Sequence, residues 1–357
     1  MTKAMMKAAV YHGPGDLRIE EVPRPETGPR DVVLRVDRVG VCGSDLHVYR
    51  TGQFGTGPGM IMGHEFAATA VEVGDDVEGA RVGGRYTGFT IGFCGECYWC
   101  EHGSPRLCPE LFSRYSGYGK PGAMAEFIRI EDAEVGSNLI EIPDGVSDEA
   151  AAMAEPLGTA TYSIHRAKPK GGDTVVVIGA GPVGLLLVQA LKATADVRVI
   201  VTEMSEPRAH LAAEVGADHV LDARRPDLLE AVQELTGTGR WSFGSGGMAD
   251  IVFDAAAAPP TFEQALLFVR SQGTVCLVGV SEQPATVDPS LIVHKDIRVI
   301  GVFGSSIPHG MRLIADGEVS VEALVSHRFP LAEAAAAFET AAGPTALKVM
   351  LRPQDAT

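Results

Sequence analysis

The feature that most limits the fold of this chain is the alternation of apolar, strand-like runs with helical stretches in its second half. From about residue 172, six such runs follow one another: TVVVIGAG, VRVIVTE, HVLD, DIVFDAA, TVCLVGV and IRVIGVF. Most are separated by stretches of helical character, such as PVGLLLVQALKAT after the first run. Strands connected through helices in this way lie parallel in one sheet with helices on both faces. The pattern therefore predicts a doubly wound parallel sheet.

Residues 6–155 have a different character. Short strand-like runs are separated there by Gly, Pro and Asp, as in LRIEEVPRP, DVVLRVDRVGV, AATAVEVG and AEFIRI. This punctuation predicts a β-rich domain with long loops. A chain of 357 residues is also too long for one ordinary core, so we expect an α/β protein of two domains. After residue 304 we expect a helical tail, because PLAEAAAAFETAAG suits a packed helix.

The net charge limits the partners of the protein. Thirty basic and 46 acidic residues give −16, which argues against nucleic acid or an anionic membrane as partner. No apolar run approaches the roughly 20 residues needed to cross a bilayer. The start, MTKAMMKAAVYHGPG, lacks the apolar core of a signal peptide. We therefore expect a cytoplasmic protein, and in that compartment clustered cysteines more often bind metal than form disulfides.

A glycine-rich motif marks a nucleotide site. Gly179, Gly181 and Gly184 lie between an apolar run and a helical stretch, where they permit a tight turn, close approach of a pyrophosphate and close helix packing. The phosphates would lie at the helix N-terminus. Glu203 ends the next strand and would bind the ribose hydroxyls and repel a 2′-phosphate, which favours NAD. Arg208 leaves NADP open, because a nearby arginine can hold that phosphate.

Two further sets of residues suggest metal sites. Cys94, Cys97, Cys100 and Cys108 are clustered in FCGECYWCEHGSPRLC, which is compatible with a disulfide knot, a metal site or an Fe–S cluster. The residues of the second set are far apart in the sequence. They are Cys42 in VCGSDLHVY, His64 in MGHEF and Glu155 in MAEPLG. Singly, Cys42 and His64 are typical of ordinary core residues. Together with Glu155 they supply a Zn²⁺ set that can leave one position open for substrate.

With these motifs the chain resembles, over essentially its whole length, the zinc-dependent medium-chain dehydrogenases/reductases of the alcohol dehydrogenase superfamily. Its marks are the Cys-Gly-Ser-Asp-x-x-His run, Gly-His-Glu, the four cysteines, Glu-Pro before the nucleotide domain and GxGxxG. The branch is that of sorbitol, butanediol and threonine dehydrogenases, and LVSHRFPLAEAAAAFET is especially similar to sorbitol dehydrogenases. The resemblance implies a GroES-like catalytic domain at 1–156 with a structural zinc lobe at about 92–110. A Rossmann NAD-binding domain at 157–296 and a segment at 297–357 that returns to the catalytic domain would follow.

The resemblance also implies two zinc ions per chain. One would be structural, held by the four cysteines of the lobe: Cys94, Cys97, Cys100 and Cys108. The other would be catalytic and bound by Cys42 and His64. Glu65 would be a direct or exchanging ligand of that ion, and Glu155 would bind it directly or through water. Four thiolates make a closed tetrahedral site that can pin a loop with little core of its own.

For the chemistry, the resemblance implies that Ser44 takes the alcohol proton and His47 relays it to solvent through the nicotinamide ribose. Asp45 would hydrogen-bond the far nitrogen of His64 and fix its tautomer. Zinc would act as a Lewis acid at the alcohol oxygen while hydride leaves for the nicotinamide.

Around the cofactor, Pro182 and Val183 would approach the pyrophosphate, and Arg208 would lie near the adenosine ribose. The expected protein is a homodimer or homotetramer, with the choice open.

The chain also departs from the family pattern. Ala68 stands where the Gly-His-Glu signature usually continues to glycine. Gly304 and Ser305 follow Val-Phe where sorbitol dehydrogenases usually carry Arg-Tyr. The aromatic residue expected soon after His47 is also displaced, because Val48 stands before Tyr49. A guanidinium and a phenol that grip polyol hydroxyls are therefore missing, which counts against sorbitol itself.

We therefore expect a zinc-dependent oxidoreductase that transfers a hydride from a secondary alcohol to NAD, the alcohol being a diol, polyol, sugar or hydroxy amino acid. Two alternatives remain. One is a zinc-free, NADPH-dependent quinone or enone reductase, which has no use for Cys42, His64 and Glu155. The other is a non-catalytic protein that binds zinc and a nucleotide, which has no use for the spacing of Ser44 and His47.

Overall fold

The computed structural model describes residues 4–53, 57–88 and 91–355. The chain divides into two compact units. Unit 1 comprises Met1–Glu155, Ile307–Gly317 and Val321–Thr357, and unit 2 comprises Pro156–Ser306 and Glu318–Ser320. Each unit has its own sheet, so each is described by itself.

Unit 2 contains a six-stranded parallel sheet in the order β11-β10-β9-β14-β15-β16. Its strands are β9 (Thr174–Ile178), β10 (Arg198–Glu203), β11 (His219–Asp222), β14 (Ala249–Asp254), β15 (Val269–Leu277) and β16 (Arg298–Gly301). The helices are α4 (Ala154–Ala167), whose first two residues belong to unit 1, α5 (Pro182–Thr194), α6 (Glu206–Glu214), α7 (Leu228–Thr236), α8 (Thr261–Phe268) and α9 (Pro289–Lys295). The chain moves outward from β9 to β11 and then returns to place β14 beside β9. This order confirms the predicted doubly wound sheet.

Two details of unit 2 differ from the sequence pattern. The helical stretch TFEQALLFVRSQG ends at Phe268, because Val269 is fully buried and already pairs with Ala249 of β14. A small hairpin, β12 (Gly239–Trp241) and β13 (Gly244–Gly246), precedes β14 and was not predicted. Its short, glycine-rich strands give no alternating pattern to detect.

Unit 1 is β-rich, as expected. A seven-stranded sheet has the order β17-β18-β3-β5-β6-β8, with β7 paired to β3, and a smaller sheet has the order β2-β1-β4. The strands are β1 (Met5–Gly13), β2 (Asp16–Pro23), β3 (Val32–Val41), β4 (Met60–Ile61), β5 (Glu65–Val73), β6 (Arg85–Gly88), β7 (Phe127–Ile130), β8 (Leu139–Glu141), β17 (Val325–Pro330) and β18 (Lys348–Arg352). The α-helices are α1 (Gly43–Thr51), α2 (Tyr98–Glu101), α3 (Asp148–Ala152), α10 (Ile307–Ala315) and α11 (Ala334–Ala341).

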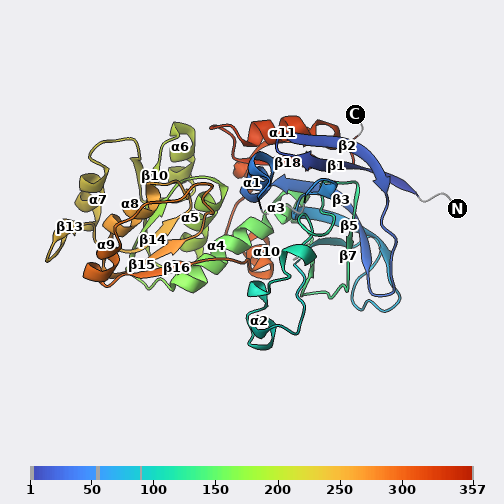
Figure 1. Ribbon diagram of the computed structural model, residues 1–357, viewed down its shortest axis with the longest axis horizontal. Helices are drawn as coiled ribbons and strands as arrows, with labels where there is room; N and C mark the ends of the chain where they lie inside the picture. The colour runs from blue at the N-terminus through green and yellow to red at the C-terminus, as the bar shows by residue number, and fades with distance from the viewer. Residues whose placement is uncertain (1–3, 54–56, 89–90, 356–357) are drawn as a thin grey trace. The chain divides into compact units, whose positions relative to one another are not determined.

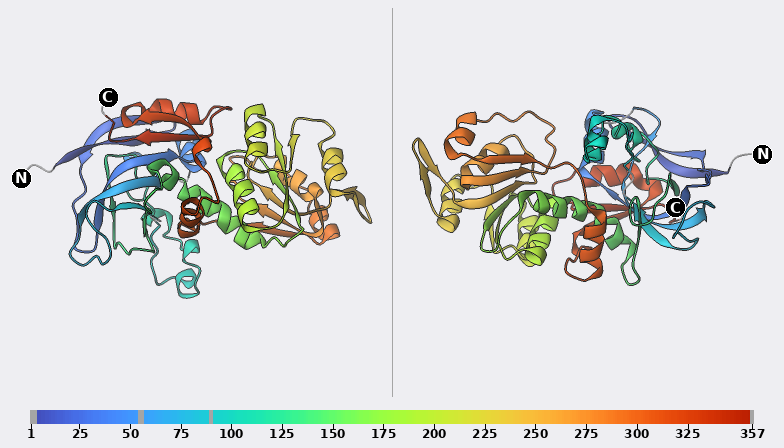
Figure 2. Two further views of the ribbon diagram at one scale, coloured as in Figure 1. Left: turned by 180° about the vertical axis from the view of Figure 1, so that it is seen from behind. Right: turned by 90° about the horizontal axis from the view of Figure 1, so that it is seen from below.

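The C-terminal tail contributes strands as well as helices to unit 1. Strand β18 pairs antiparallel with β3, so that Val349 faces Val41, and β17 pairs parallel with β18. Figures 1 and 2 show these red elements beside the blue N-terminal strands. The expectation of a purely helical tail is therefore corrected. The run from Val349 to Leu351 is fully buried, and a fully buried strand shows no period-two alternation.

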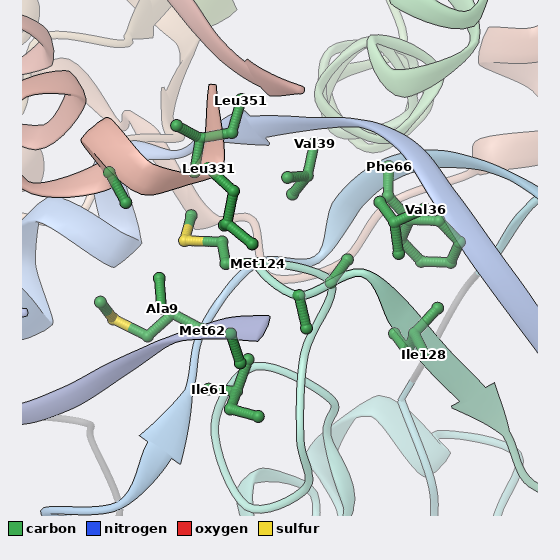
Figure 3. Close-up of a cluster of buried hydrophobic side chains, with 14 of the residues drawn as sticks. Ala9, Val36, Val39, Ile61, Met62, Phe66, Met124, Ile128, Leu331 and Leu351 are labelled. Atoms are coloured by element: carbon green, nitrogen blue, oxygen red, sulfur yellow. The ribbon is translucent and has the colours of Figure 1, made fainter. Parts of the chain in front are cut away.

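The core of unit 1 joins segments from both ends of the chain. Figure 3 shows Leu331 and Leu351 packed in one cluster with Val36, Phe66 and Met124. This packing fixes the ends of β3 and β5, which carry the candidate metal ligands described next. Among the described residues, none of the helices is both long and apolar enough to cross a membrane.

Candidate metal centres and nucleotide site

The first candidate centre lies where β3 ends and α1 begins. Cys42 is the N-cap residue of α1, and its main-chain N–H donates to Oδ2 of Asp45 at 3.0 Å. Asp45 is fully buried. A carboxylate at the third helical position that reaches back to the N-cap is half of a capping box. This local contact fixes Cys42 at the N-terminus of α1.

His64 and Glu65 approach Cys42 because of the register of two strands. Glu65 opens β5 and pairs with Gly40 near the end of β3. A Cβ at position 40 would lie 2.4 Å from Oε2 of Glu65, so a larger residue there would displace that carboxylate. One ligand atom from each of Cys42, His64 and Glu65 lies within 4.8 Å of the other two. Sulfur, imidazole nitrogen and carboxylate oxygen are the donors that Zn²⁺ takes, so this trio fits zinc.

Buried charges surround the trio. Lys348 of β18 donates from Nζ to Glu65 Oε2 at 2.5 Å and to the Val41 carbonyl at 3.2 Å. Both side chains of the pair are at most 3% exposed. Burial alone would lower the pKa of Lys348, but the charges of Glu65 and Cys42 raise it. Lysine 348 lies in an apolar strand run, and that break in the pattern is the signal by which sequence reasoning could have found it.

The trio also leaves buried polar atoms without partners. Among the described residues, Asp45 Oδ1, His64 Nδ1 and Glu65 Oε1 have no hydrogen-bond partner. Burial would lower the pKa of His64, but the negative charge of Asp45, with contributions from Cys42 and Glu155, raises it well above its ordinary value. Buried polar atoms without partners are costly, and the surplus of negative charge favours a cation. These observations are independent support for a metal at this position.

Two predicted contacts around the trio are looser than expected. His64 Nδ1 and Asp45 Oδ1 are 3.6 Å apart, which exceeds an ordinary hydrogen bond. The predicted bond between them therefore stays a prediction for the metal-loaded protein. Glu155 lies in the first turn of α4, outside the group of three ligand atoms within 4.8 Å, and acts on His64 through its charge. Its predicted role as a zinc ligand stays a prediction as well.

The two residues of the expected proton relay both lie on α1. Ser44 is half-buried, and His47 is 5% exposed and three residues further along, which places both on one side of the helix. His47 Nε2 lies 3.4 Å from Oε1 of Gln53. The departure noted at Val48 and Tyr49 also lies on this helix, and the Tyr49 phenol donates to Glu339 at 3.0 Å. Tyr49 is therefore engaged by the C-terminal tail.

Two tyrosines that sequence reasoning missed border the trio. The rings of Tyr115 and Tyr118 stack at 4.9 Å, and their centroids lie 5.6 and 5.7 Å from that of His64. Both phenols have a pKa well above the ordinary value, first because of burial and then because of nearby negative charges, Glu155 for Tyr115 and Asp45 for Tyr118. Nothing in the run RYSGYG distinguishes these two from surface tyrosines, so only the fold reveals them.

The second candidate centre is the four-cysteine lobe, which includes α2. The distances between its sulfur atoms are 3.5 Å for Cys97 and Cys100, 3.5 Å for Cys108 and Cys94, and 3.9 Å for Cys94 and Cys100. All four are free cysteines. A disulfide needs about 2.05 Å. Four thiolates about 2.3 Å from one zinc lie roughly 3.8 Å apart, so the lobe fits a tetrahedral zinc site.

The main chain of the lobe favours the thiolate of Cys94, whereas burial raises the pKa of Cys100 to about 12. A hydrogen bond from the Glu96 N–H lowers the pKa of Cys94 to about 7, with a further contribution from the Cys97 N–H. Thiolate, not thiol, is the form that binds zinc. Only Cys108 of the four is buried, and α2 has four residues. The lobe therefore has little core of its own.

The glycine-rich loop of unit 2 connects β9 to α5. Gly179 has φ of +92°, and a Cβ on Gly184 would lie 1.9 Å from the Gly179 carbonyl, so both positions require glycine. A Cβ on Gly181 would meet nothing within 4 Å, which leaves open space at the N-cap of α5. Pro182 and Val183 form the first turn of that helix. Free N–H groups beside open space fit a pyrophosphate.

Glu203 lies at the end of β10, beside this loop. Its Oε2 accepts the Ala180 N–H at 2.6 Å, and its Oε1 accepts the N–H groups of Met204 and Ser205, each at 2.8 Å. The carboxylate is therefore fixed at the strand end and tied to the glycine-rich loop. Arg208 is half-buried on α6, five residues further on. The arrangement fits an adenosine ribose at this edge of the sheet.

Comparisons with known proteins agree with both units. Residues 28–144 match the family model of the alcohol dehydrogenase GroES-like domain, and residues 182–316 match that of zinc-binding dehydrogenases. A sorbitol dehydrogenase of Halalkalibacterium halodurans is 33% identical over 99% of this chain and 100% of its own. A sorbitol dehydrogenase of Bombyx mori is 31% identical over 98% of this chain and 99% of its own.

Among solved structures, 2R,3R-butanediol dehydrogenase of Bacillus subtilis is similar with a TM-score of 0.86 and 30% identity, over 98% of this chain and 100% of that one. The chain belongs to the zinc-dependent medium-chain dehydrogenases/reductases of the alcohol dehydrogenase superfamily. Within that class it falls in the sorbitol dehydrogenase-like branch, and it is an NAD(P)-dependent oxidoreductase with a GroES-like and a Rossmann domain.

Proposed function

We propose that this protein oxidises a secondary alcohol, such as a diol, polyol, sugar or hydroxy amino acid, with NAD as hydride acceptor and two zinc ions per chain. The observation that carries the proposal is the convergence of Cys42, His64 and Glu65 within 4.8 Å, with orphaned polar atoms and surplus negative charge around them. When bound, zinc supplies a Lewis acid at the alcohol oxygen and NAD supplies the hydride acceptor.

In this proposal Cys42 and His64 hold the catalytic zinc, with Glu65 as a direct or exchanging ligand and Glu155 as a direct or water-mediated one. Lys348 limits the reach of Glu65, since it already binds one carboxylate oxygen. The lobe holds the structural zinc through its four cysteines: Cys94, Cys97, Cys100 and Cys108.

Ser44 would take the alcohol proton at its hydroxyl, and His47 would relay that proton to solvent, with the nicotinamide ribose between them when NAD is bound. Ser44→Ala is expected to cut turnover by about two to four orders of magnitude, the usual span for positioned proton transfer. NAD binding, measured by fluorescence titration, should change little. A parallel loss of NAD binding and turnover would mean that Ser44 has only a structural role.

The preference for NAD rests on Glu203, whose carboxylate is held by three main-chain N–H groups. A fixed carboxylate repels a 2′-phosphate and accepts ribose hydroxyls. Similar structures are described with each cofactor: a zinc-binding dehydrogenase of Sinorhizobium meliloti bound to NADP, and an Escherichia coli alcohol dehydrogenase complexed with NADH. Glu203→Ser should weaken NAD by about 1–3 kcal/mol and improve NADP. A wild-type preference for NADP in kcat/KM would instead make Arg208 the main determinant.

The substrate class follows the relatives, which are named for sorbitol, butanediol and, at lower identity, L-idonate. Gly304 and Ser305, in place of the family's Arg-Tyr, argue against sorbitol itself. A spectrophotometric screen of diols, polyols, sugars and threonine with NAD and NADP, together with zinc analysis, tests the proposal. Two zinc ions per chain and NAD-dependent turnover of a secondary alcohol are expected. Enone reduction by NADPH without metal would favour the zinc-free alternative instead.

We place the protein in the cytoplasm as a homodimer or homotetramer. In that compartment, clustered cysteines more often bind metal than form disulfides. Light scattering of the purified protein distinguishes the two assemblies.

A further inference from the structure

Tyr118 links the candidate metal centre to the candidate proton relay. Its side chain is 4% exposed, and its phenol shares a hydrogen bond with the hydroxyl of Ser44. Ser44 lies on α1, whereas Tyr118 lies in the loop between Phe112–Arg114 and β7, more than seventy residues away in sequence. The proposed function gives Ser44 a task but does not explain what orients it.

The ring of Tyr118 is held on several sides. It stacks on Tyr115 with centroids 4.9 Å apart, lies 5.7 Å from the His64 ring, and meets the edge of Phe112 at 5.5 Å. A phenylalanine at 118 could make the same ring contacts. The phenol oxygen is therefore fixed in space by packing, and it is the part of this side chain that reaches the relay.

Resting on the proposed function, we propose that Tyr118 is a positioning residue, whose fixed phenol holds the Ser44 hydroxyl in the one orientation suited to accepting the alcohol proton. A serine hydroxyl has one proton and two acceptor lone pairs, and it rotates freely unless a partner holds it. A bond to a rigid phenol selects one rotamer before substrate arrives. Such preorganisation is worth about 10- to 100-fold in rate when small displacements are prevented.

The test is Tyr118→Phe, which removes the hydroxyl and keeps the ring. We expect kcat to fall about 10- to 100-fold, the substrate KM to change less than threefold, and the solvent deuterium isotope effect on kcat to rise because proton transfer has become slower. Zinc content and NAD affinity should equal those of the wild type. Tyr115→Phe is expected to lower kcat less, since the described contacts of Tyr115 include no bond to Ser44.

The matched control is Tyr86→Phe. Tyr86 is also fully buried, and its phenol accepts the Arg81 N–H at 3.1 Å, in β6 and away from α1. This variant loses one buried phenol bond and should cost some stability while keeping kcat and the isotope effect. If Tyr118→Phe behaves like Tyr86→Phe, the phenol is only a packing element and the inference is wrong.

A crystallographic arm separates this inference from the proposed function. In zinc-loaded wild type, the Ser44 Oγ should lie within hydrogen-bond distance of the Tyr118 phenol, and Ser44 should adopt another rotamer or several in Tyr118→Phe. A wild type that has this geometry but does not oxidise alcohols would contradict the proposed function and would still support the contact between Tyr118 and Ser44. A wild type that oxidises alcohols with Ser44 turned away from Tyr118 would overturn the inference alone.

Discussion

The two candidate metal centres of unit 1 are built in opposite ways. The trio of Cys42, His64 and Glu65 depends on the pairing of β3 with β5 and on Lys348, which is 283 residues from Glu65 in sequence. Its histidine and glutamate are buried. The lobe takes all four sulfurs from one short stretch, Cys94 to Cys108, in which three of the cysteines are partly exposed and the one α-helix has four residues. The sheet holds the first centre in place, whereas we expect the second to be held by a bound metal.

This difference predicts that metal loss has different consequences at the two centres. At the trio, the donors are already positioned by packing, so losing the ion removes chemistry and leaves the fold. At the lobe, the ion replaces a hydrophobic core, so losing it removes structure. The following variants test this contrast in order of expected effect.

The largest effect is expected for Cys42→Ala. Turnover should fall by at least about 10³-fold, roughly 4 kcal/mol of transition-state stabilisation, because a Lewis acid is lost. Zinc analysis should show one ion per chain instead of two, while Tm stays within about 3 °C of the wild type. Cys276→Ala, in the core of unit 2, is the control: it removes a buried cysteine sulfur outside both centres and should keep both ions and turnover. Near-normal activity in Cys42→Ala would show that the trio is not the catalytic centre.

The next effect concerns the ion pair behind the trio. Lys348→Met leaves the buried carboxylate of Glu65 without its counter-charge, which should cost about 3–5 kcal/mol of unfolding free energy in metal-free protein. Adding Glu65→Leu should restore most of that loss. The exposed pair of Arg81 and Glu141 is the matched control, and Arg81→Met should cost about 1 kcal/mol or less. The unfolding free energies are measured by urea denaturation. Equal losses for Lys348→Met and Arg81→Met would contradict the view that burial makes the pair of Lys348 and Glu65 important for stability.

The same contrast explains how much could be predicted from the sequence. Features that are local in sequence were found: the glycine-rich loop, the strands of the doubly wound sheet, and the four cysteines. Cys42 and His64 were identified by their motifs. Lys348 and Tyr118 were missed, because each acquires its role from a partner more than seventy residues away. Strand β18 was missed because the burial of its first four residues removes the alternation that reveals a strand.

Cys97→Ser should have a smaller effect than the variants above. Unlike Cys42→Ala, it should lower the stability and leave turnover nearly unchanged. It should release the lobe's zinc and lower Tm by about 4–8 °C, equivalent to about 2 kcal/mol for a unit of this size. Turnover at 25 °C in zinc-containing buffer should stay within about twofold of the wild type. Calorimetry and zinc analysis on the same sample check this. A variant that loses activity before it loses stability would mean that the lobe contributes to the chemistry directly.

The smallest effect is expected at Tyr98, and it tests whether metal or side-chain packing holds the lobe together. Tyr98 stacks on His102 with centroids 4.1 Å apart and meets Trp99 edge-on, yet it is 63% exposed. An aromatic pair contributes about 0.5–1.5 kcal/mol beyond burial, and less when water surrounds it. Tyr98→Ala should therefore shift Tm of the zinc-loaded protein by less than about 2 °C and leave both ions bound. If Tyr98→Ala instead releases zinc and matches the loss of Cys97→Ser, the aromatic stack is a core for the lobe, and the contrast between the two centres is smaller than their burial indicates.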